Sequence, residues 1–425
     1  MDNINHLLQV LLNLASDDIQ TIRITNKDST PFYFVRLNSS LQECPICSST
    51  SFRSLGYYKR EVILPNNVFT GAKVILEVPR KYCCTCNSSF SDMKHMAPKN
   101  KTISYKTILE VMELLKDQKM IFNSVATLLH ISESSVVRIF DSHCHITRST
   151  FPDVVCIDEV YTKNSDFNSK YSCIFYDFYQ HSIIDVLPSR HKSYLHHYFQ
   201  DIPRDELLNV KYVCIDMYRP YKDIVKLYFK KALICVDSFH VIKHLNEDLS
   251  KVRIRVMKKY SIDSNEYYLL KNWENLLFDN NIELNNQGKY NKRFKQVLNY
   301  RQLQELIFQI DSDIRIAYQL KDNYMRFNQT STIKEAPAYL DTCIESFILA
   351  NIPEYCEFTS LLTNWREEII NSFTLYKGRR INNSVAESMN AKISTLLFNT
   401  KGIRNHERRK KRIMYMINKT GFSVK

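Results

Sequence analysis

Two short apolar segments that each end in an aspartate constrain the fold of this chain more than any other feature. The segment VVCID ends at Asp158 and the segment KYVCID ends at Asp216. Continuous apolar runs of this length are typical of strands that are covered on both faces of an α/β sheet. A carboxylate at the end of such a strand faces a cleft, because a buried unpaired charge would cost several kcal/mol. We therefore predict that Asp158 and Asp216 are metal ligands.

The segments around these aspartates have the order of a complete sheet. After the first strand come two strands in hairpin order (YSCIFYDF and SIIDVLPS), a helix (SYLHHYFQDI), the Asp216 strand, a helix (YKDIVKLYF) and a strand that ends at Asp237. The order βββαβαβ is that of the ribonuclease-H-like fold, in which the first and fourth strands lie side by side. We predict an α/β catalytic domain of this fold.

The pattern changes after this sheet. From about residue 242 to 370 the sequence indicates long helices rich in Lys, Asn, Gln and Tyr, and such a block is too long to be a loop. We interpret it as an α-helical insertion. Near the end, INNSVAESMNAKISTLL predicts a helix in which Glu387 and Asn390 share a face.

The C-terminal tail is strongly basic. Residues 401–425 contain nine Lys or Arg against one Glu. We predict that this tail contacts nucleic acid, and a merely solubilising tail is the alternative. The candidate contact residues are Arg408, Arg409, Lys410, Lys411 and Arg412.

Two pairs of cysteines predict a structural zinc site near the N-terminus. One pair is Cys44 with Cys47, and the other lies in Cys83-Cys84-Thr-Cys86. We prefer Cys83 over Cys84 as the partner of Cys86, because it gives the usual CxxC spacing. Two β-rich pieces between the pairs (REVILPNN and AKVILEVPRKY) favour a zinc ribbon. Four thiolates leave zinc no open position, so this site is predicted to support folding or DNA docking; free core thiols are the alternative.

The spacing of apolar residues in SVATLLHISESSVVRIFDSH is typical of a helix-turn-helix. Val125, Leu128 and Leu129 would face inward, and Ser132 would cap the second helix. Any amphipathic helix pair looks similar, so a purely structural pair remains open. The outward residues able to meet a major groove would be Ser134, Ser135 and Arg138.

Composition limits the possible partners. The net charge of +13 and the pI near 9.0 favour nucleic acid first and an anionic membrane surface second. No apolar run approaches the ~18–20 residues that span a bilayer, and the start has no secretory signal. We therefore expect a cytoplasmic protein that binds no membrane. The predicted segments are an N-terminal helical segment (1–35), the zinc ribbon (36–100) and the helix-turn-helix (101–150). They are followed by the first part of the catalytic domain (151–241), the insertion (242–370) and the last helix with the tail (371–425).

In combination these motifs resemble the DDE transposases of the bacterial insertion-sequence family ISL3. The matching pieces follow the family's order over nearly the full length: CPIC and RKYCCTCNSSF, SVATLLHISESSVVRI, CIDEVY, YSCIFYDF, VCIDMYRPY, VDSFHVIKHLN, NNSVAESMNAKI and KGIRN. The resemblance implies a ribonuclease-H-like domain with a helical insertion, and it places the catalytic triad on Asp158, Asp216 and Glu387. The chain departs from the family pattern in its irregular second Cys pair and in Ser388, where the family usually has Gly.

The implied reaction is in-line displacement at phosphorus, for which two Mg²⁺ or Mn²⁺ ions suit three carboxylates. Asp158 would bridge the ions, and Asp216 and Glu387 would each complete one coordination sphere. Glu159 points to the opposite strand face and is a poorer candidate. Asp237 is the rival ligand, and we expect it to support the site without binding metal.

The implied partners are the element's terminal inverted repeats, target DNA and further copies of the chain, as a homodimer or higher oligomer associated with the bacterial nucleoid. Two alternatives remain. One is a catalytically inactive DNA-binding regulator, and the other is a ribonuclease-H-like nuclease that acts on RNA or DNA junctions.

Overall fold

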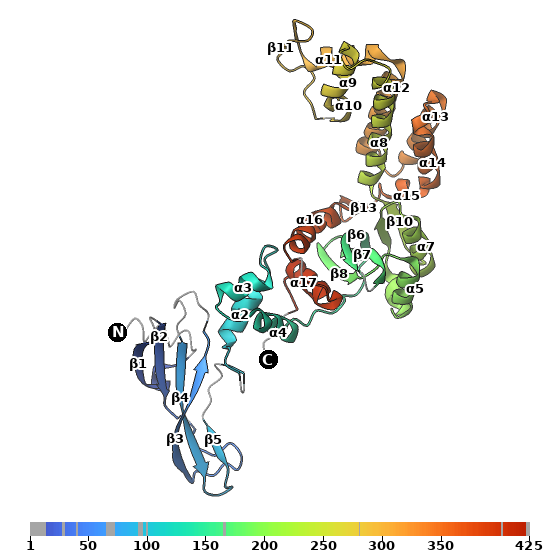
Figure 1. Ribbon diagram of the computed structural model, residues 1–425. Helices are drawn as coiled ribbons and strands as arrows, with labels where there is room; N and C mark the ends of the chain where they lie inside the picture. Colours follow the sequence, from blue (N-terminus) through green and yellow to red (C-terminus); the bar gives the residue numbers. More distant parts are fainter. Residues whose placement is uncertain are drawn as a thin grey trace. The chain divides into compact units, whose positions relative to one another are not determined.

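The chain divides into two compact units in the computed structural model, and each is described by itself (Figure 1). The first unit comprises Met1–Thr147 together with Lys392–Lys425, and the second comprises Arg148–Ala391. The structure describes residues 14–27, 30–39, 41–64, 73–91, 97–98, 101–164, 167–279, 281–400 and 403–421.

A five-stranded sheet forms the N-terminal part of the first unit. Its order is β1-β2-β4-β3, and β5 pairs with β4. The two pieces predicted to be β-rich contribute to β3 and β4, which pair antiparallel. The strands are β1 (Ile19–Lys27), β2 (Thr30–Leu37), β3 (Phe52–Val62), β4 (Lys73–Cys83) and β5 (Ser89–Ser91), after a short 3₁₀ turn η1 (Ser16–Asp18).

The start of the chain differs from the prediction of a helical segment over residues 1–35. Residues 1–13 lie outside the described part, and β1 and β2 occupy most of the remainder. The segment IQTIRITNK has the near-alternation of apolar and polar residues that suits a strand. Val35 and Leu37 of β2 are buried with Val74 and Leu76 of β4, so this part of the sheet has its own core.

Three helices follow in the first unit: α2 (Tyr105–Leu114), α3 (Phe122–Leu128) and α4 (Glu133–His143). The predicted turn and cap are confirmed: His130 has a φ of 49°, and the Ser132 hydroxyl accepts from the backbone N–H of Ser135 at 3.2 Å. Leu129 is buried as predicted, but the inward prediction for Leu128 is wrong, because its side chain is 45% exposed. Leu129 lies one turn after Val125 and shares its buried face.

The basic C-terminal segment forms α17 (His406–Asn418), which packs into this helical cluster. The Tyr415 ring meets Phe140 edge-on at 6.0 Å between centroids, and its hydroxyl donates to the carbonyl of Met112 at 3.0 Å. Arg412 is 1% exposed, and its guanidinium donates to the carbonyls of Asp117 and Met120, both at 2.9 Å. The tail is therefore a structural helix of the first unit.

The second unit is built on a sheet of order β10-β9-β6-β7-β8. The predicted order of strands and helices is confirmed, and β6 pairs in parallel with β9, with Val154 opposite Tyr212. The elements are β6 (Val154–Asn164), β7 (Ser169–Asp177), β8 (Ser182–Leu187), α5 (Lys192–Gln200), α6 (Arg204–Asn209), β9 (Tyr212–Ile215), α7 (Arg219–Tyr228) and β10 (Leu233–Val236).

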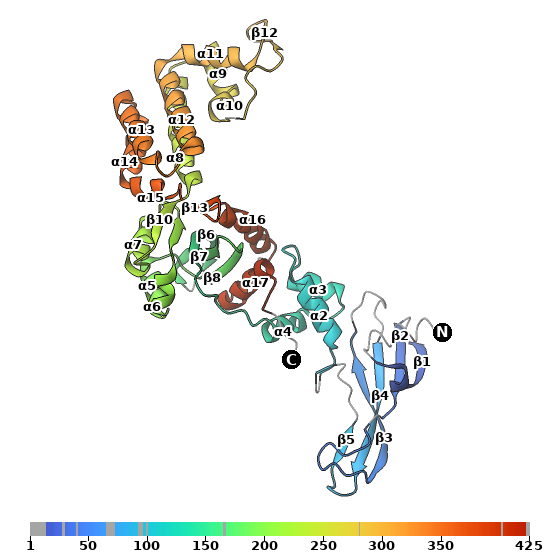
Figure 2. The same ribbon diagram turned by 180° about the vertical axis from the view of Figure 1, so that it is seen from behind.

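The segment after β10 is largely helical, as predicted, and α8 and α12 lie side by side in it (Figures 1 and 2). A small hairpin, β11–β12, interrupts the helices and was not predicted. The helices are α8 (Ser238–Met257), α9 (Asn265–Asn272), α10 (Asn275–Phe278), α11 (Tyr300–Ile310), α12 (Ser312–Thr330), α13 (Ala336–Ala350), η3 (Pro353–Tyr355), α14 (Cys356–Asn364) and α15 (Arg366–Asn371), and the hairpin strands are β11 (Lys289–Asn291) and β12 (Gln296–Leu298).

The last elements do not form one domain with the tail over residues 371–425. The hairpin of β13 (Leu375–Tyr376) and β14 (Arg379–Arg380) belongs to the second unit, whereas the unit boundary falls after Ala391, inside α16 (Ser384–Asn399). Within the described part of the chain, we find no helix with the length and apolar character that a membrane span requires.

The burial of Arg412 predicts a local loss of stability on its substitution. In Arg412→Met two backbone carbonyls lose a charged donor, which costs about 2 kcal/mol. Amides of α17 should then exchange hydrogen about 30-fold faster, as measured by mass spectrometry. The matched control, Arg404→Met, changes an exposed arginine next to the same helix and should leave the exchange unchanged. Equal exchange in the two variants would contradict a structural role for Arg412.

Candidate functional site

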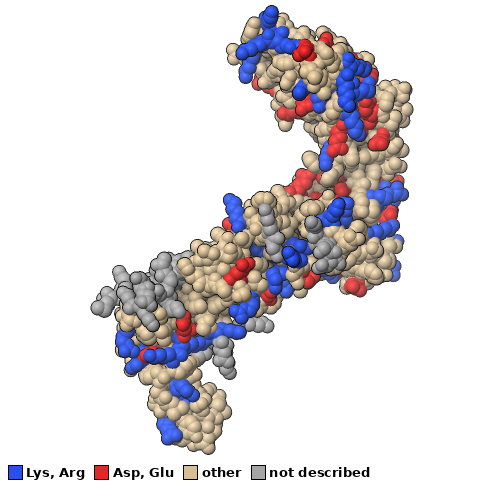
Figure 3. All heavy atoms as spheres, in the orientation of Figure 1, with Lys and Arg blue, Asp and Glu red and all other residues tan. Residues whose placement is uncertain are grey.

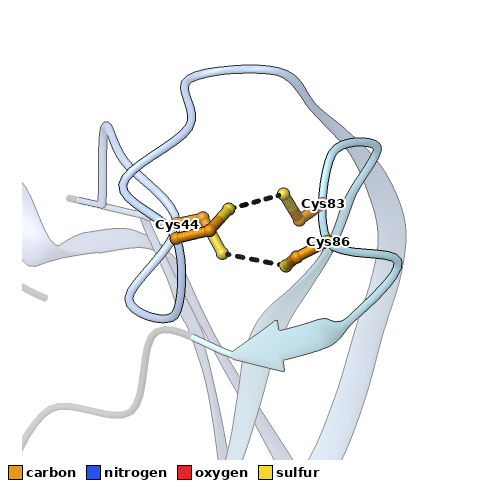
Figure 4. A group of neighbouring side chains, drawn as sticks. Cys44, Cys83 and Cys86 are labelled. Carbon is orange, nitrogen blue, oxygen red and sulfur yellow. Dashed lines mark hydrogen bonds between the residues drawn. The ribbon is translucent and has the colours of Figure 1, made fainter.

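Four cysteines converge at one end of the ribbon sheet, and Figure 4 shows the loops that carry them. The sulfurs of Cys44, Cys47, Cys83 and Cys86 all lie within 4.8 Å of one another. The Sγ–Sγ distance is 3.7 Å between Cys44 and Cys86, and 3.6 Å between Cys47 and Cys83. Four sulfurs bonded tetrahedrally to zinc at about 2.3 Å would lie about 3.8 Å apart. The donor set and its spacing therefore fit a closed zinc site.

The backbone explains why Cys83, and not Cys84, completes this cluster. The N–H of Cys44 donates to the carbonyl of Ser49 at 2.8 Å, and the N–H of Cys83 donates to Ser88 at 2.9 Å. Residues Ser48 and Asn87, each directly after the second cysteine of its pair, have φ values of 57° and 55°. The two loops thus repeat one conformation. Cys84 takes the place that Pro45 has in the first loop, and its side chain is exposed.

The electrostatics of Cys83 suit a metal ligand. Hydrogen bonding from the backbone of Cys86 lowers the pKa of the Cys83 thiol to about 6, against an opposing effect of desolvation. Its thiolate is therefore favoured at neutral pH, and the thiolate is the form that binds metal.

The predicted DNA-facing residues of the helix-turn-helix lie on α4. Ser134 and Arg138 are exposed, and Ser135 is half-buried. The Arg138 guanidinium donates to the Ser135 hydroxyl at 3.2 Å. Both residues line a cavity of about 580 Å³ in the first unit that also contains Lys101 and His143, and none of its described lining residues is acidic.

The structure separates the five basic tail residues into two groups. Arg409 and Arg412 are buried, and Arg408 pairs with Asp141 of α4 at 2.6 Å. Lys410 and Lys411 are half-buried on α17. The structure thus uses three of these arginines for packing or pairing inside the first unit, and phosphate contact stays a prediction for Lys410 and Lys411.

In the second unit, two of the predicted acidic residues lie on the paired strands β6 and β9. Asp158 is inside β6, and Asp216 directly follows β9. One oxygen of Asp158 accepts from the N–H of Glu159 at 2.8 Å, and one oxygen of Asp216 accepts from the N–H of Tyr218 at 3.0 Å. Because β6 and β9 run parallel with Cys156 opposite Cys214, Asp158 and Asp216 occupy corresponding positions, each two residues further along its chain, although β6 itself continues to Asn164.

Helix α16 is bonded to this part of the sheet. The Asn390 side-chain amide donates to the second oxygen of Asp158 at 2.8 Å, and the Tyr176 hydroxyl donates to the amide oxygen of Asn390. Glu387 lies one turn before Asn390 on the same helix, so it faces the same region. At the start of α16, the backbone N–H of Asn383 donates to Asp237 at 3.4 Å.

Two carboxylate oxygens in this region are buried without a hydrogen-bond donor among the described residues. They are Oε1 of Glu387 and Oδ2 of Asp237. The Nε2 atom of His240 lies 3.8 Å from this Asp237 oxygen, beyond hydrogen-bond distance. Buried polar atoms in proteins are normally paired, so two unpaired acidic oxygens indicate a site that binds something further.

The pKa values of all four acids are raised, and in each case burial is the largest cause. The pKa of Asp158 is raised to about 7 by burial and by the negative charge of Asp216. Burial also raises the pKa of Asp216, Asp237 and Glu387, with the charge of Asp237 adding to the effect at Glu387. A bound cation would offset this repulsion.

The carboxylates do not converge on a single point. Among the described residues, the four cysteines are the only group of three or more potential metal ligands whose atoms all lie within 4.8 Å of one another. A wider spacing is compatible with two ions about 3.5–4 Å apart, because the outer ligands then bind different ions.

Glu159 has a separate role next to these acids. Its carboxylate pairs with the guanidinium of Arg190, which lies over the rings of Tyr171 and Tyr218 at 4.4 and 4.7 Å. This pairing agrees with the prediction that Glu159 is a poorer ligand.

A cavity of about 530 Å³ lies close to these acids. Met217, the residue after Asp216, is one of the residues that line it.

Two polar residues of this region, Asn390 and Tyr176, were not predicted to bond to the acids or to one another. The sequence predicted only that Asn390 shares a helix face with Glu387. That shared face was the one feature that could have indicated a role for Asn390 near the acids. Tyr176 lies within an apolar strand, where nothing in the sequence separates it from a core aromatic residue.

A match to a known protein family identifies the class of protein to which this chain belongs. Residues 155–413, more than half of the chain, match a family model described as a transposase. The chain belongs to the ISL3 family of DDE transposases. No curated protein gives a significant match to the sequence.

The raised pKa of Asp158 predicts the pH dependence of stability without metal. An acid whose pKa is raised by folding destabilises the folded state as the pH rises from about 4 to about 7, because the unfolded chain releases the proton first. Asp158→Asn removes this effect and should be more stable than the wild type at pH 7.5, by about 2–4 kcal/mol, with a smaller difference at pH 4.5.

This difference can be followed by thermal unfolding in a chelator. Both tryptophans of the chain, Trp273 and Trp365, lie in the second unit, so their fluorescence monitors that unit. Parallel curves of stability against pH for the two proteins would rule out a raised pKa at Asp158.

Proposed function

We propose that this chain is a DNA transposase that binds the terminal inverted repeats of its insertion sequence and catalyses metal-dependent DNA cleavage and strand transfer. The observation that carries the proposal is the hydrogen bond between Asn390 and Asp158. It holds the helix that bears Glu387 against the strand that bears Asp158, in a chain of a transposase family.

The sheet supports a ribonuclease-H-like catalytic domain. Three antiparallel strands, β6 to β8, are followed by β9, which pairs in parallel with β6, and by β10, which pairs in parallel with β9, and helices α5 to α7 connect these strands. This is the strand order expected for that fold, with a helical insertion before the last catalytic helix.

We assign Asp158, Asp216 and Glu387 as the ligands of two Mg²⁺ or Mn²⁺ ions. Their hard oxygen donors suit these ions. When bound, two such ions activate the attacking hydroxyl and stabilise the leaving oxygen at phosphorus. The unpaired oxygen of Glu387 and the raised pKa of Asp158 support this assignment.

Asn390 and Asp237 would act as positioning residues. Asn390 fixes the orientation of the Asp158 carboxylate by one hydrogen bond and is itself fixed by Tyr176. Asp237 accepts from the N–H of Asn383 and so holds the first turn of α16.

DNA recognition is assigned to the first unit. Ser134, Ser135 and Arg138 would face the major groove, with Lys410 and Lys411 as phosphate contacts. The zinc-bound cysteine cluster would fix the ribbon that precedes the helix-turn-helix. If both ends of the insertion sequence are cut together, the active form would be a homodimer or higher oligomer. It would act in the bacterial cytoplasm.

Removal of any one carboxylate should abolish the chemistry without abolishing DNA binding. We expect Asp158→Ala, Asp216→Ala and Glu387→Ala each to lower Mg²⁺-dependent strand transfer by at least ~10³-fold. Glu305→Ala, which changes an exposed glutamate of the insertion, should keep wild-type activity. An inactive regulator predicts instead that the wild type binds DNA and transfers no strand.

The cysteine cluster gives a paired test of the zinc assignment. Cys83→Ser should lose zinc, measured by elemental analysis of the purified protein, because it removes one of four ligands. Cys84→Ser changes the neighbouring, exposed thiol and should retain zinc at the wild-type level. The opposite result would exchange the roles of the two cysteines.

A further inference from the structure

The hairpin β11–β12 in the helical insertion carries a concentration of positive charge. Between Glu283 and Glu305 the sequence contains five Lys or Arg and no Asp or Glu. Lys289, Lys292 and Lys295 are all exposed, and none of the three forms an ion pair within the described part of the chain. Figure 3 shows Lys and Arg gathered over this end of the insertion, where Figure 1 places β11.

The hairpin is held firmly on α9 by contacts that leave these lysines outside. The Asn291 side chain accepts from the backbone N–H of Arg293 at 3.0 Å and so closes the turn. The Arg293 guanidinium donates to the side chain of Asn265 at 2.8 Å, and Phe294 packs on Tyr268 at 6.2 Å between centroids. Arg293 therefore acts structurally, and the lysines are presented on an ordered support.

One face of the hairpin exposes an apolar pair between the lysines. Tyr290 and Val297 are directly opposite each other in the register of β11 and β12, and they are 63% and 61% exposed. The other face turns Asn291 and Leu298 inward. An exposed aromatic and a β-branched residue, on a hairpin whose only charged side chains are cations, match the chemistry of a DNA groove, where phosphates border base edges that apolar side chains can contact.

We propose that this hairpin is a second DNA-binding element of the chain, with the three lysines on phosphates and the Tyr290–Val297 pair in the groove between them. This inference rests on the proposed function. Helix α8 begins directly after Asp237 and has 20 residues, so it extends about 30 Å from the catalytic acids toward this end of the insertion. The contacted DNA would then lie about nine base pairs or more from the cleaved phosphate.

The test compares two triple variants of the full-length protein with the same loss of charge. The first is Lys289→Gln with Lys292→Gln and Lys295→Gln. The control is Lys226→Gln with Lys230→Gln and Lys231→Gln, which changes three exposed lysines beside α7. Binding to a fluorescent double-stranded DNA of random sequence is measured over a range of salt, with Ca²⁺ in place of Mg²⁺ to prevent cleavage.

We expect the hairpin variant to bind at least about 10-fold more weakly and to lower the salt slope of log K by up to about 2.7, because each phosphate contact contributes about 0.9. The control should change neither quantity beyond a small common effect. Tyr290→Ser with Val297→Ser should weaken binding and leave the salt slope unchanged. Equal affinity and slope for the two triple variants would overturn the proposal.

Two further outcomes keep this inference separate from the proposed function. If the wild type never cleaves DNA but the hairpin variant alone loses affinity, the proposed function fails and the hairpin proposal stands. If the hairpin variant changes the oligomeric state in sedimentation and not DNA affinity, the hairpin is a contact for an acidic protein surface, and the proposal is overturned.

Discussion

The candidate catalytic region depends on one hydrogen bond between side chains 232 residues apart, from Asn390 to Asp158. The rest of the sheet and the whole insertion lie between these two residues in the sequence. Without this bond the carboxylate of Asp158 would lose one of its two donors, and Asn390 would contact the sheet only through the Tyr176 hydroxyl. The donor in this bond is the neutral amide of Asn390, so the bond holds α16 in place without adding a positive charge beside Asp158. The acids consequently retain their mutual repulsion.

That repulsion is what makes the site suitable for cations. Two buried acids, Asp158 and Asp237, and two half-buried acids, Asp216 and Glu387, have raised pKa values and are costly without bound cations, and the described residues around them include few positive groups. Arg190 is engaged by Glu159, and His240 lies 3.8 Å from Asp237. A chain selected for stability alone would pair these acids or replace them. Their retention in this state supports a site whose folding cost is recovered when divalent ions and a phosphodiester bind.

Much of this arrangement was readable from the sequence because it depends on local patterns. Apolar runs ending in Asp158 and Asp216 fixed the strands, and the CxxC spacing selected Cys83. Contacts between distant segments were not readable. The basic run in α17 has the composition of a nucleic-acid tail, yet Arg412 satisfies two carbonyls of the helical cluster, since a long side chain can bury its stem and still donate. The early strands were missed because the N-terminal apolar residues suggested a helix, and the hairpin β11–β12 was missed because each strand has only three residues.

The same long-range contacts explain why the insertion can extend far from the sheet without disturbing the acids. Its first helix starts at Asp237, whose side chain accepts from the N–H of Phe239 and from that of Asn383. One carboxylate therefore marks both the point where the chain leaves the sheet and the point where it returns. The helices between these points are free to carry other functions, provided that both ends stay bonded to Asp237. If the proposed function holds, a charged hairpin on such a support would reach DNA remote from the reacting phosphate, while the geometry of the acids is set independently.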